Sequence, residues 1–443
     1  MASCSRPSTI HPERLRLPRT KLAAIGSRKH TCHIMSNVCL WRREYILQPE
    51  DEPKLRSVLR TTKVRGVHVG FMETSLGETK LFRYRNRSDP AVMRSPSFSS
   101  CVPLVWWPLW GYNLAEFFLN SVTAVSELLD AGVIDDTVSL APEVGGWRLV
   151  GFQEQMLRAL SRQPVRTPSQ IAPRCKDGQR CQPQCFARML VCRFKDVYDK
   201  MPPIAPARAA QRILPSFNFP QEPQAAAADP FVVLFVDRQN AKQGARRITN
   251  VAGLLERCRK WRASSACVGD RPTRCELHTF GRRGLRADVK AVRRAHVLVG
   301  THGAALTHAM FMRPRSAFVE IRPYHFDGSW PDSYHYAMAQ RENATRAFVV
   351  RTVDPSLCTP IPQANVSAWD ARPLDTHVLP RVLLRALDAA ACTRGLGDEL
   401  LGSSHVSSHA GLSSAITTLA QLPRHPRSRF DYNALMSPVL ENG

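Results

Sequence analysis

Residues 231–250 read FVVLFVDRQNAKQGARRITN, and residues 297–312 read VLVGTHGAALTHAMFM. Each stretch opens with a short, continuous apolar run of strand length, which is typical of a parallel strand buried on both faces. In the second stretch the run passes through a turn of small residues into an apolar segment of helical length. A strand that leads into a helix is the building unit of an open parallel α/β sheet. The two stretches therefore predict this class of fold.

The surrounding segments continue the alternation of strands and helices. Asn250 stands where it would cap the helix that follows the first stretch. The pattern predicts strands at 231–236, 274–279, 296–299 and 316–321, and helices at 251–260, 287–295, 304–312 and 377–394. We therefore expect residues 226–400 to form one parallel α/β domain.

The rest of the chain divides around this domain, and 443 residues suffice for two domains of middling size with tails. Amphipathic helices predicted at 114–131 and 152–161 mark a second domain at 101–225. Residues 1–100 are basic and have few apolar runs apart from possible strands at 64–71 and 80–84, so we expect a weakly organised extension. Residues 401–443 are polar, and we expect a disordered tail.

Two loops follow the carboxyl ends of predicted strands, where open parallel sheets bind their ligands. The first loop carries Arg238, Arg246 and Arg247. The second contains Gly300 and Gly303, and glycines at a helix N-terminus let backbone amides approach an anion closely. Arginines facing such a turn would bind a diphosphate through paired hydrogen bonds. The alternatives are tight strand-to-helix packing for the glycines and a solvated run of charge for the arginines.

These two stretches resemble a known family. The sequence VLVGTHGAALTHAMFMRPRSAFVEIRPY at 297–324 resembles the HGAGLTH-type signature of family-61 glycosyltransferases, and the stretch at 231–250 resembles their upstream segment. The resemblance covers residues 231–352 and, more weakly, 106–156. It implies a GT-B fold, in which two Rossmann-like domains, the two predicted above, face a cleft.

The resemblance also implies an activity. The family includes extracellular and mannose-linked O-GlcNAc transferases and plant xylan xylosyl- and arabinosyltransferases. Its members transfer a sugar from a nucleotide diphosphate donor with inversion and without an obligatory metal. We therefore expect a hexosyl- or pentosyltransferase whose partners are a nucleotide sugar, UDP-linked, and a glycan or glycoprotein acceptor. No cofactor is expected besides this donor substrate.

The resemblance carries roles over to matching residues. Arg238, Arg246 and Arg247 would hold the donor diphosphate. The phosphate-facing turn would consist of Gly300, His302, Gly303 and Ala304, with His302 donating a hydrogen bond to a phosphate or to the transferred sugar. Thr307 would do likewise one turn into the helix, and Glu320 would bind the two ribose hydroxyls from a strand end. The alternatives are a helix-face role for Thr307 and a surface ion pair for Glu320.

The first predicted helix departs from the family pattern. Family members commonly show Asn-x-x-His-x-x-x-Asp there, and this chain has Asn113, Glu116 and Asn120 at those three positions. An inverting transferase needs a base to take the acceptor hydroxyl proton, and an asparagine cannot do so. Glu116 shares a helix face with Asn120 and is the candidate base. Its alternative is a carboxylate stabilised by the helix dipole, and the chain would then be a catalytically silent relative that binds a nucleotide sugar or glycan.

The net charge of +24, from 61 Lys plus Arg against 37 Asp plus Glu, raises the question of an anionic partner. The excess consists of 50 Arg and only 11 Lys, a bias that a GC-rich genome also produces. A nucleic-acid-binding protein is the less favoured alternative, because no helix-turn-helix, zinc-finger or RNA-binding motif accompanies the charge.

The sequence alone leaves the cellular compartment of the protein open. The thirteen cysteines form no CxxC pair, which disfavours zinc and leaves buried thiols and lumenal disulfides. Sequons at Asn86, Asn343 and Asn365 are compatible with a secretory route. No apolar stretch approaches the roughly 20 residues of a membrane span, and no signal sequence is visible. Family resemblance implies the Golgi or endoplasmic reticulum lumen; a cytoplasmic protein, or a start upstream of this sequence, is the alternative.

Overall fold

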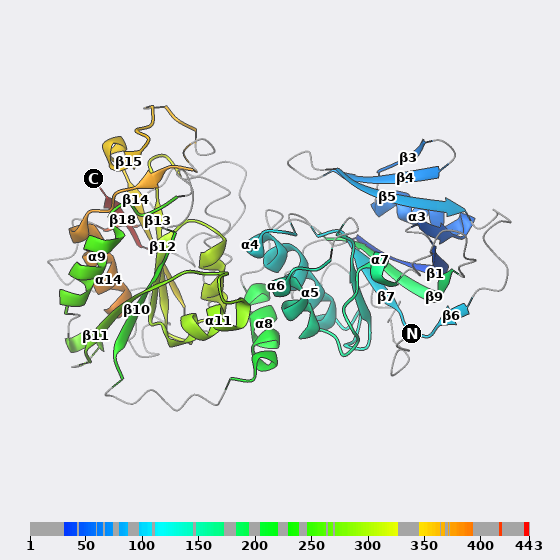
Figure 1. The fold of residues 1–443 in the computed structure, drawn as a ribbon, viewed down its shortest axis with the longest axis horizontal. Coiled ribbons are helices and arrows are strands. Elements are labelled where there is room, and N and C mark those ends of the chain that lie inside the picture. The colour runs from blue at the N-terminus through cyan, green and yellow to red at the C-terminus, as the bar shows by residue number, and fades with distance from the viewer. Residues whose placement is uncertain are drawn as a thin grey trace. The chain divides into compact units, whose positions relative to one another are not determined.

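The structure is a computed structural model that divides into two compact units, Met1–Ser216 and Phe217–Gly443, which are described separately (Figure 1). It describes residues 31–41, 44–58, 60–64, 67–73, 79–86, 97–108, 111–144, 148–171, 183–194, 204–219, 229–238, 246–262, 265–268, 271–326, 345–363, 365–367, 371, 373–392, 416–418 and 438–442.

The first unit contains a mixed sheet, which has nine strands among the described residues. Its order is β3-β4-β5-β2-β1-β9-β7-β8, and β6 pairs with β9. The pairings of β7 with β8 and β9 are parallel, whereas β1 is antiparallel to β2 and β9. The strands are β1 (Thr31–Trp41), β2 (Glu44–Leu47), β3 (Arg60–Val64), β4 (Val67–Glu73), β5 (Thr79–Asn86), β6 (Ser97–Ser99), β7 (Pro103–Trp106), β8 (Ser139–Pro142) and β9 (Gln184–Arg193).

The helix predicted at 114–131 is confirmed as a continuous run of three helical segments. Asn113 caps it, a π-helical turn interrupts it, and Gly132 follows its end with a positive φ of 62°. The helical segments of this unit are η1 (Pro49–Asp51), α3 (Glu52–Val58), α4 (Leu114–Phe117), η2 (Phe118–Val122), α5 (Thr123–Asp130), α6 (Gly151–Arg158), α7 (Pro168–Ile171) and α8 (Ile204–Ile213); η3 (Leu214–Phe217) ends at the boundary with the second unit.

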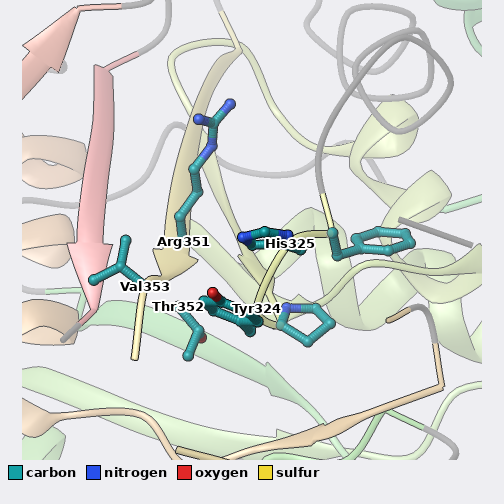
Figure 2. A pocket seen from close by; sticks show the side chains of 7 residues that line it. Tyr324, His325, Arg351, Thr352 and Val353 are labelled. Atoms are coloured by element: carbon teal, nitrogen blue, oxygen red, sulfur yellow. The ribbon is translucent and has the colours of Figure 1, made fainter. Parts of the chain in front are cut away.

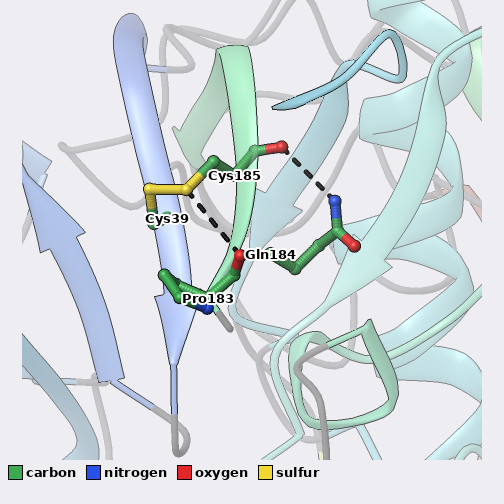
Figure 3. Close-up of a disulfide and its surroundings, with 4 residues drawn as sticks. All are labelled: Cys39, Pro183, Gln184 and Cys185. Atoms are coloured by element: carbon green, nitrogen blue, oxygen red, sulfur yellow. Dashed lines mark hydrogen bonds between the residues drawn. A yellow bond between two sulfur atoms is a disulfide. The ribbon is translucent and has the colours of Figure 1, made fainter. Parts of the chain in front are cut away.

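The N-terminal region differs from the weakly organised extension that we expected for residues 1–100. Strand β1 packs Met35, Val38 and Leu40 into a core with β9. Two disulfides, Cys32–Cys192 and Cys39–Cys185, join residues that face each other in the β1–β9 register. Figure 3 shows the Cys39–Cys185 disulfide. Both close loops of more than a hundred residues, which removes much of the chain entropy of the unfolded state. Buried apolar side chains and two disulfides therefore hold this strand together.

The second unit contains the predicted parallel sheet, in the order β11-β10-β12-β13-β14-β18-β17. Neighbouring strands from β11 to β18 are parallel, and β17 is antiparallel to β18. The strands are β10 (Phe231–Val236), β11 (Thr273–His278), β12 (Val297–Thr301), β13 (Ala317–Arg322), β14 (Arg346–Thr352), β17 (Ile416–Thr418) and β18 (Pro438–Asn442); β15 (Cys358–Thr359) and β16 (Asp375–Thr376) form a separate pair. Four of the parallel strands were predicted, and β14 was not.

Helices cover this sheet as the alternation predicts. They are α9 (Val251–Lys260), α10 (Ser265–Val268), α11 (Leu285–Arg294), η4 (Ala304–Phe311), η5 (Pro355–Leu357) and α14 (Pro380–Cys392). Leu254 of α9 and Leu383 of α14 belong to one hydrophobic core with Val319 of β13, and both helices lie on the same face of the sheet (Figure 1). The predicted helix at 304–312 is confirmed in position, but it is a 3-10 helix.

The segment expected to be a disordered tail contains strands β17 and β18. β18 continues the sheet beside β14, because its short apolar run can occupy a strand position there. The rest of residues 401–443 lies outside the described residues.

Cysteines of the second unit also pair. Cys258 is joined to Cys275, and Cys267 to Cys392, while Cys358 is a buried free thiol. Among the described residues no group of histidines, cysteines and carboxylates could hold a metal ion. No helix in this part of the chain is long and apolar enough to cross a membrane.

Candidate functional site

The predicted turn after β12 lies against the Arg238 side chain, which follows β10. A Cβ atom added at Gly303 would lie 2.9 Å from Nη2 of Arg238. The guanidinium therefore occupies the space that a side chain at position 303 would fill. Burial lowers the pKa of Arg238, and the charge of Asp375 opposes that shift. Because arginine keeps its proton in proteins, Arg238 brings a partly desolvated positive charge to the start of η4.

Arg246 reaches the same turn through its backbone. Its carbonyl oxygen accepts a hydrogen bond of 2.6 Å from Oγ1 of Thr301, the last residue of β12. Arg246 adopts the left-handed conformation, with φ of 62°. Its charge also lowers the pKa of His302. The two loops that the sequence singled out are therefore brought together, with Arg238 and Arg246 near one turn.

Arg247 has a different partner. Its Nε and Nη2 donate to Oδ2 of Asp375 at 2.9 and 2.7 Å, and its backbone N–H donates to Oδ1 at 2.7 Å. Asp375, in β16, is fully buried. Arg247 is therefore neither a member of a solvated charge run nor wholly available to a diphosphate. Its main contact anchors the arginine loop to β16.

His302 is held by a buried carboxylate. Its Nδ1 forms a short contact with Oε1 of Glu320, and Oε2 of Glu320 accepts from Nε of Arg322 at 2.9 Å. All three side chains are buried. Burial lowers the pKa of His302; Glu320 raises it, and Arg322 and Arg246 lower it. The imidazole is therefore neutral at pH 7, and its contact with the carboxylate assigns the proton to Nδ1.

This arrangement changes two predicted roles. Glu320 was expected to bind ribose hydroxyls, yet it lies in the buried strand β13 with both carboxylate oxygens bonded to protein side chains. His302 was expected to donate a hydrogen bond to the ligand. With its proton on Nδ1, its Nε2 atom is an acceptor. Glu320 therefore acts here as the residue that positions His302.

Of the remaining turn residues, some are buried in packing contacts and others lie at the surface of the turn. A Cβ atom at Gly300 would lie 2.7 Å from Cγ2 of Val236, so close packing of β12 on β10 explains this glycine. Thr307 is buried, and its hydroxyl has no hydrogen-bond partner among the described residues. Ala304 is the first residue of η4 and is partly exposed. Only Gly303 and Ala304 are therefore placed where η4 offers the unpaired amides of a helix start.

The candidate base lies in the first unit. Glu116 accepts a hydrogen bond of 2.7 Å from Nδ2 of Asn120, which confirms that the two side chains share a helix face. Asn120 is buried within the π-helical turn η2. Such turns occur frequently at functional sites. Asn120 therefore holds the Glu116 carboxylate through this hydrogen bond and does not itself act as a base.

Two residues of this site were missed in the sequence. Asp375 lies 128 residues from Arg247, and no local pattern marks it. Arg322 follows Glu320 by two positions in a strand, so both side chains point to the same side of the sheet, and this spacing was a usable signal.

Comparison with protein families agrees with these motifs. The family model described as Glycosyltransferase 61 matches residues 123–319, which include the turn with His302 and Gly303. No curated protein matches the chain. The match confirms the predicted resemblance and implies sugar donors and glycan acceptors in general terms. Over residues 123–319 this chain is therefore similar to glycosyltransferase family 61, and this similarity supports a glycosyltransferase.

Proposed function

We propose that this chain is an inverting, metal-independent glycosyltransferase that uses a UDP-sugar and a hydroxyl of a glycan or glycoprotein. The observation that carries the proposal is the meeting of Arg238 and Arg246 at the turn before η4. Two guanidinium groups and the first amides of a helix form a site suited to a diphosphate. The GT-B arrangement implied by the family is part of the same proposal.

In this mechanism the diphosphate leaves in a single displacement. The acceptor oxygen forms a bond to the anomeric carbon as the bond from that carbon to the diphosphate oxygen breaks. The electron pair departs with the diphosphate, where Arg238 and Arg246 stabilise the added negative charge. Their fixed positions supply the neutralisation that a metal ion supplies in other transferases.

His302 and Glu116 have complementary roles. The acceptor atom Nε2 of His302 receives a hydrogen bond from a hydroxyl of the transferred sugar and so orients the ring. Glu116 takes the proton of the attacking hydroxyl, and Asn120 keeps the carboxylate in position. A base that is held by a neutral amide keeps its charge, whereas a second carboxylate would raise its pKa.

A lumenal location fits this assignment. Four disulfides are present among the described residues, and such bonds persist in oxidising compartments. Asn365, in one of the three sequons, is exposed. We propose the Golgi or endoplasmic reticulum lumen as the place of action.

The test is a screen of nucleotide sugars and free nucleotides for thermal stabilisation, followed by a transfer assay with the donor that stabilises most. A ligand at about 100 times its Kd adds about 2.7 kcal/mol to the unfolding free energy. We expect UDP and one UDP-sugar to stabilise the protein in the presence of EDTA. Arg246→Gln should reduce this effect to about half or less, while the exposed Arg346→Gln keeps it. Absence of stabilisation by every nucleotide would refute the proposal.

The departure at Asn120 supports one second candidate, a silent relative that binds the donor without turnover. Donor hydrolysis separates the two. Turnover by the wild type that is lost in Glu116→Gln favours the enzyme. Tight donor binding without hydrolysis or transfer by the wild type favours the silent form.

A further inference from the structure

A pocket of about 250 Å³ opens at the carboxyl ends of β13 and β14. Its lining comes from two short segments, Pro323–Phe326 after β13 and Arg351–Val353 at the end of β14. Figure 2 shows the Tyr324 and His325 rings from one segment beside Arg351 and Thr352 from the other. The described site does not use this pocket.

The pocket adjoins the turn that carries His302. The rings of His302 and Phe326 are 4.9 Å apart between centroids, and Phe326 lines the pocket. The backbone N–H of His302 also donates to the carbonyl of Ile321, two residues before the pocket begins. A ligand whose diphosphate lies at Arg238 could therefore extend past the turn after β12 into this pocket at the ends of β13 and β14.

The chemistry of the lining suits a planar ring. Tyr324 and His325 are stacked, with centroids 4.1 Å apart and planes inclined by 22°. His325 is exposed and adopts the left-handed conformation, with φ of 56°. The backbone N–H of Tyr324 is fixed by a hydrogen bond to Sγ of Cys358. The pocket thus presents an aromatic face on an anchored loop.

The polar groups favour a nucleobase over a sugar. Arg351 supplies only donors, which match the carbonyl oxygens of a base. Among the described lining residues there is no carboxylate and no side-chain amide, two of the groups that accept hydrogen bonds from sugar hydroxyls. A volume just below the range of sites for drug-sized ligands favours a single ring over a purine.

We propose that this pocket binds the pyrimidine base of the donor nucleotide, with His325 and Tyr324 as the stacking surface and Arg351 as the group that recognises the ring carbonyls. The assignment deepens the proposed function and rests on it. It places base recognition on β13 and β14 and diphosphate recognition on β10 and β12.

The experiment titrates the full chain with UDP, GDP and inorganic pyrophosphate by calorimetry. The variants are His325→Ala, Arg351→Gln and, as a matched control, Arg346→Gln at the opposite end of β14. We expect wild type to bind UDP more tightly than GDP or pyrophosphate. Each pocket variant should lose about tenfold in UDP affinity, since stacking of one base contributes on that order, and should keep its pyrophosphate affinity. Arg346→Gln should match the wild type.

The outcomes separate this inference from the proposed function. Wild-type UDP affinity in both folded pocket variants would overturn the base assignment and leave the diphosphate site intact. GDP binding as tight as UDP would overturn the pyrimidine assignment. Equal loss of UDP and pyrophosphate affinity would show a structural effect and overturn the role in base recognition. Failure of wild type to bind either ligand would overturn the proposed function itself.

Discussion

Gly303→Ala tests whether the turn and Arg238 form one binding unit. The added Cβ would lie 2.9 Å from Nη2 and 3.4 Å from Cζ of Arg238. Carbon atoms do not approach that closely, and the guanidinium at the end of a flexible side chain is the group that can move. Arg238 would therefore leave the turn. The displaced atoms belong to a long side chain, but alanine at the Gly303 φ of 157° also strains the backbone of the turn, so some unfolding free energy should be lost as well.

The expected loss is that of one charge-assisted hydrogen bond, about 1.5–3 kcal/mol. Since every 1.4 kcal/mol is tenfold, UDP affinity should fall roughly 10- to 100-fold. Calorimetric titration with UDP measures this loss. Gly253→Ala is the control for an added Cβ atom that meets nothing within 4 Å, and it should leave UDP affinity unchanged and make α9 more stable by up to about 1 kcal/mol. Gly281→Ala, at a φ of 82° with equally open space, is the control for backbone strain and should also leave UDP affinity unchanged.

A double-mutant cycle assigns the effect to Arg238. If Gly303→Ala acts by displacing that side chain, Arg238→Gln should cost about as much alone as in combination with Gly303→Ala. Additive losses, or UDP affinity unchanged by Gly303→Ala, would refute the reasoning that links the glycine to the arginine.

Three further predictions follow from the packing, the buried histidine and the disulfides. Gly300→Ala places a Cβ atom 2.7 Å from Cγ2 of Val236, so urea denaturation should show a loss of about 1–3 kcal/mol, and Val236→Ala should restore part of it; full stability of the single variant would contradict the close packing. The pKa of His302 lies below its unfolded value of about 6.5, so the unfolded state binds more protons and the stabilising contribution is lost as pH falls below about 6.5. His302→Gln should therefore lose less unfolding free energy than wild type between about pH 7 and pH 5, and equal losses would show that His302 is not the group responsible. Cys39→Ala and Cys185→Ala, alone or together, should each lower the unfolding free energy by about 3 kcal/mol, because the Cys32–Cys192 disulfide still closes the long loop and Cys39–Cys185 then closes only about 15 residues; additive losses would argue against one shared bond.

The second unit could be predicted because its strands are apolar throughout. β10 and α9 lie where the sequence pattern places them, since a buried parallel strand and an amphipathic helix each leave a local periodicity. β14 was missed, because its apolar run is only four residues long between arginines. Its place in the sheet depends on its pairing with β13, and no local sequence pattern shows that pairing.

Only the parts of the site whose residues lie close together in the sequence could be predicted. The turn with Gly303 and the arginine loop follow predicted strands, so their meeting at one edge of the sheet followed from topology. The ion pair of Arg247 with Asp375 did not, because 128 residues separate the partners. The burial of Glu320 and its contacts with His302 and Arg322 were not predicted, since a residue type reveals neither its depth in the sheet nor its neighbours.

Strand β1 was missed for a related reason, whereas the possible strands at 64–71 and 80–84 overlap β4 and β5. The pairing of Cys32 and Cys39 with β9 cannot be deduced from cysteine spacing. These disulfides join strands that lie far apart in the sequence. Composition alone therefore underestimated how much of this region is ordered.

The central claim is that Arg238 and Arg246 bind the diphosphate of the donor. Calorimetric titration of the full chain with UDP in the presence of EDTA tests it most directly, with Arg238→Gln, Arg246→Gln and the control Arg346→Gln alongside. The account predicts metal-independent binding by wild type and control, and a loss of at least about tenfold in each site variant, as expected for a charge-assisted hydrogen bond. Equal UDP affinity in all four proteins, or no binding by wild type, would contradict it.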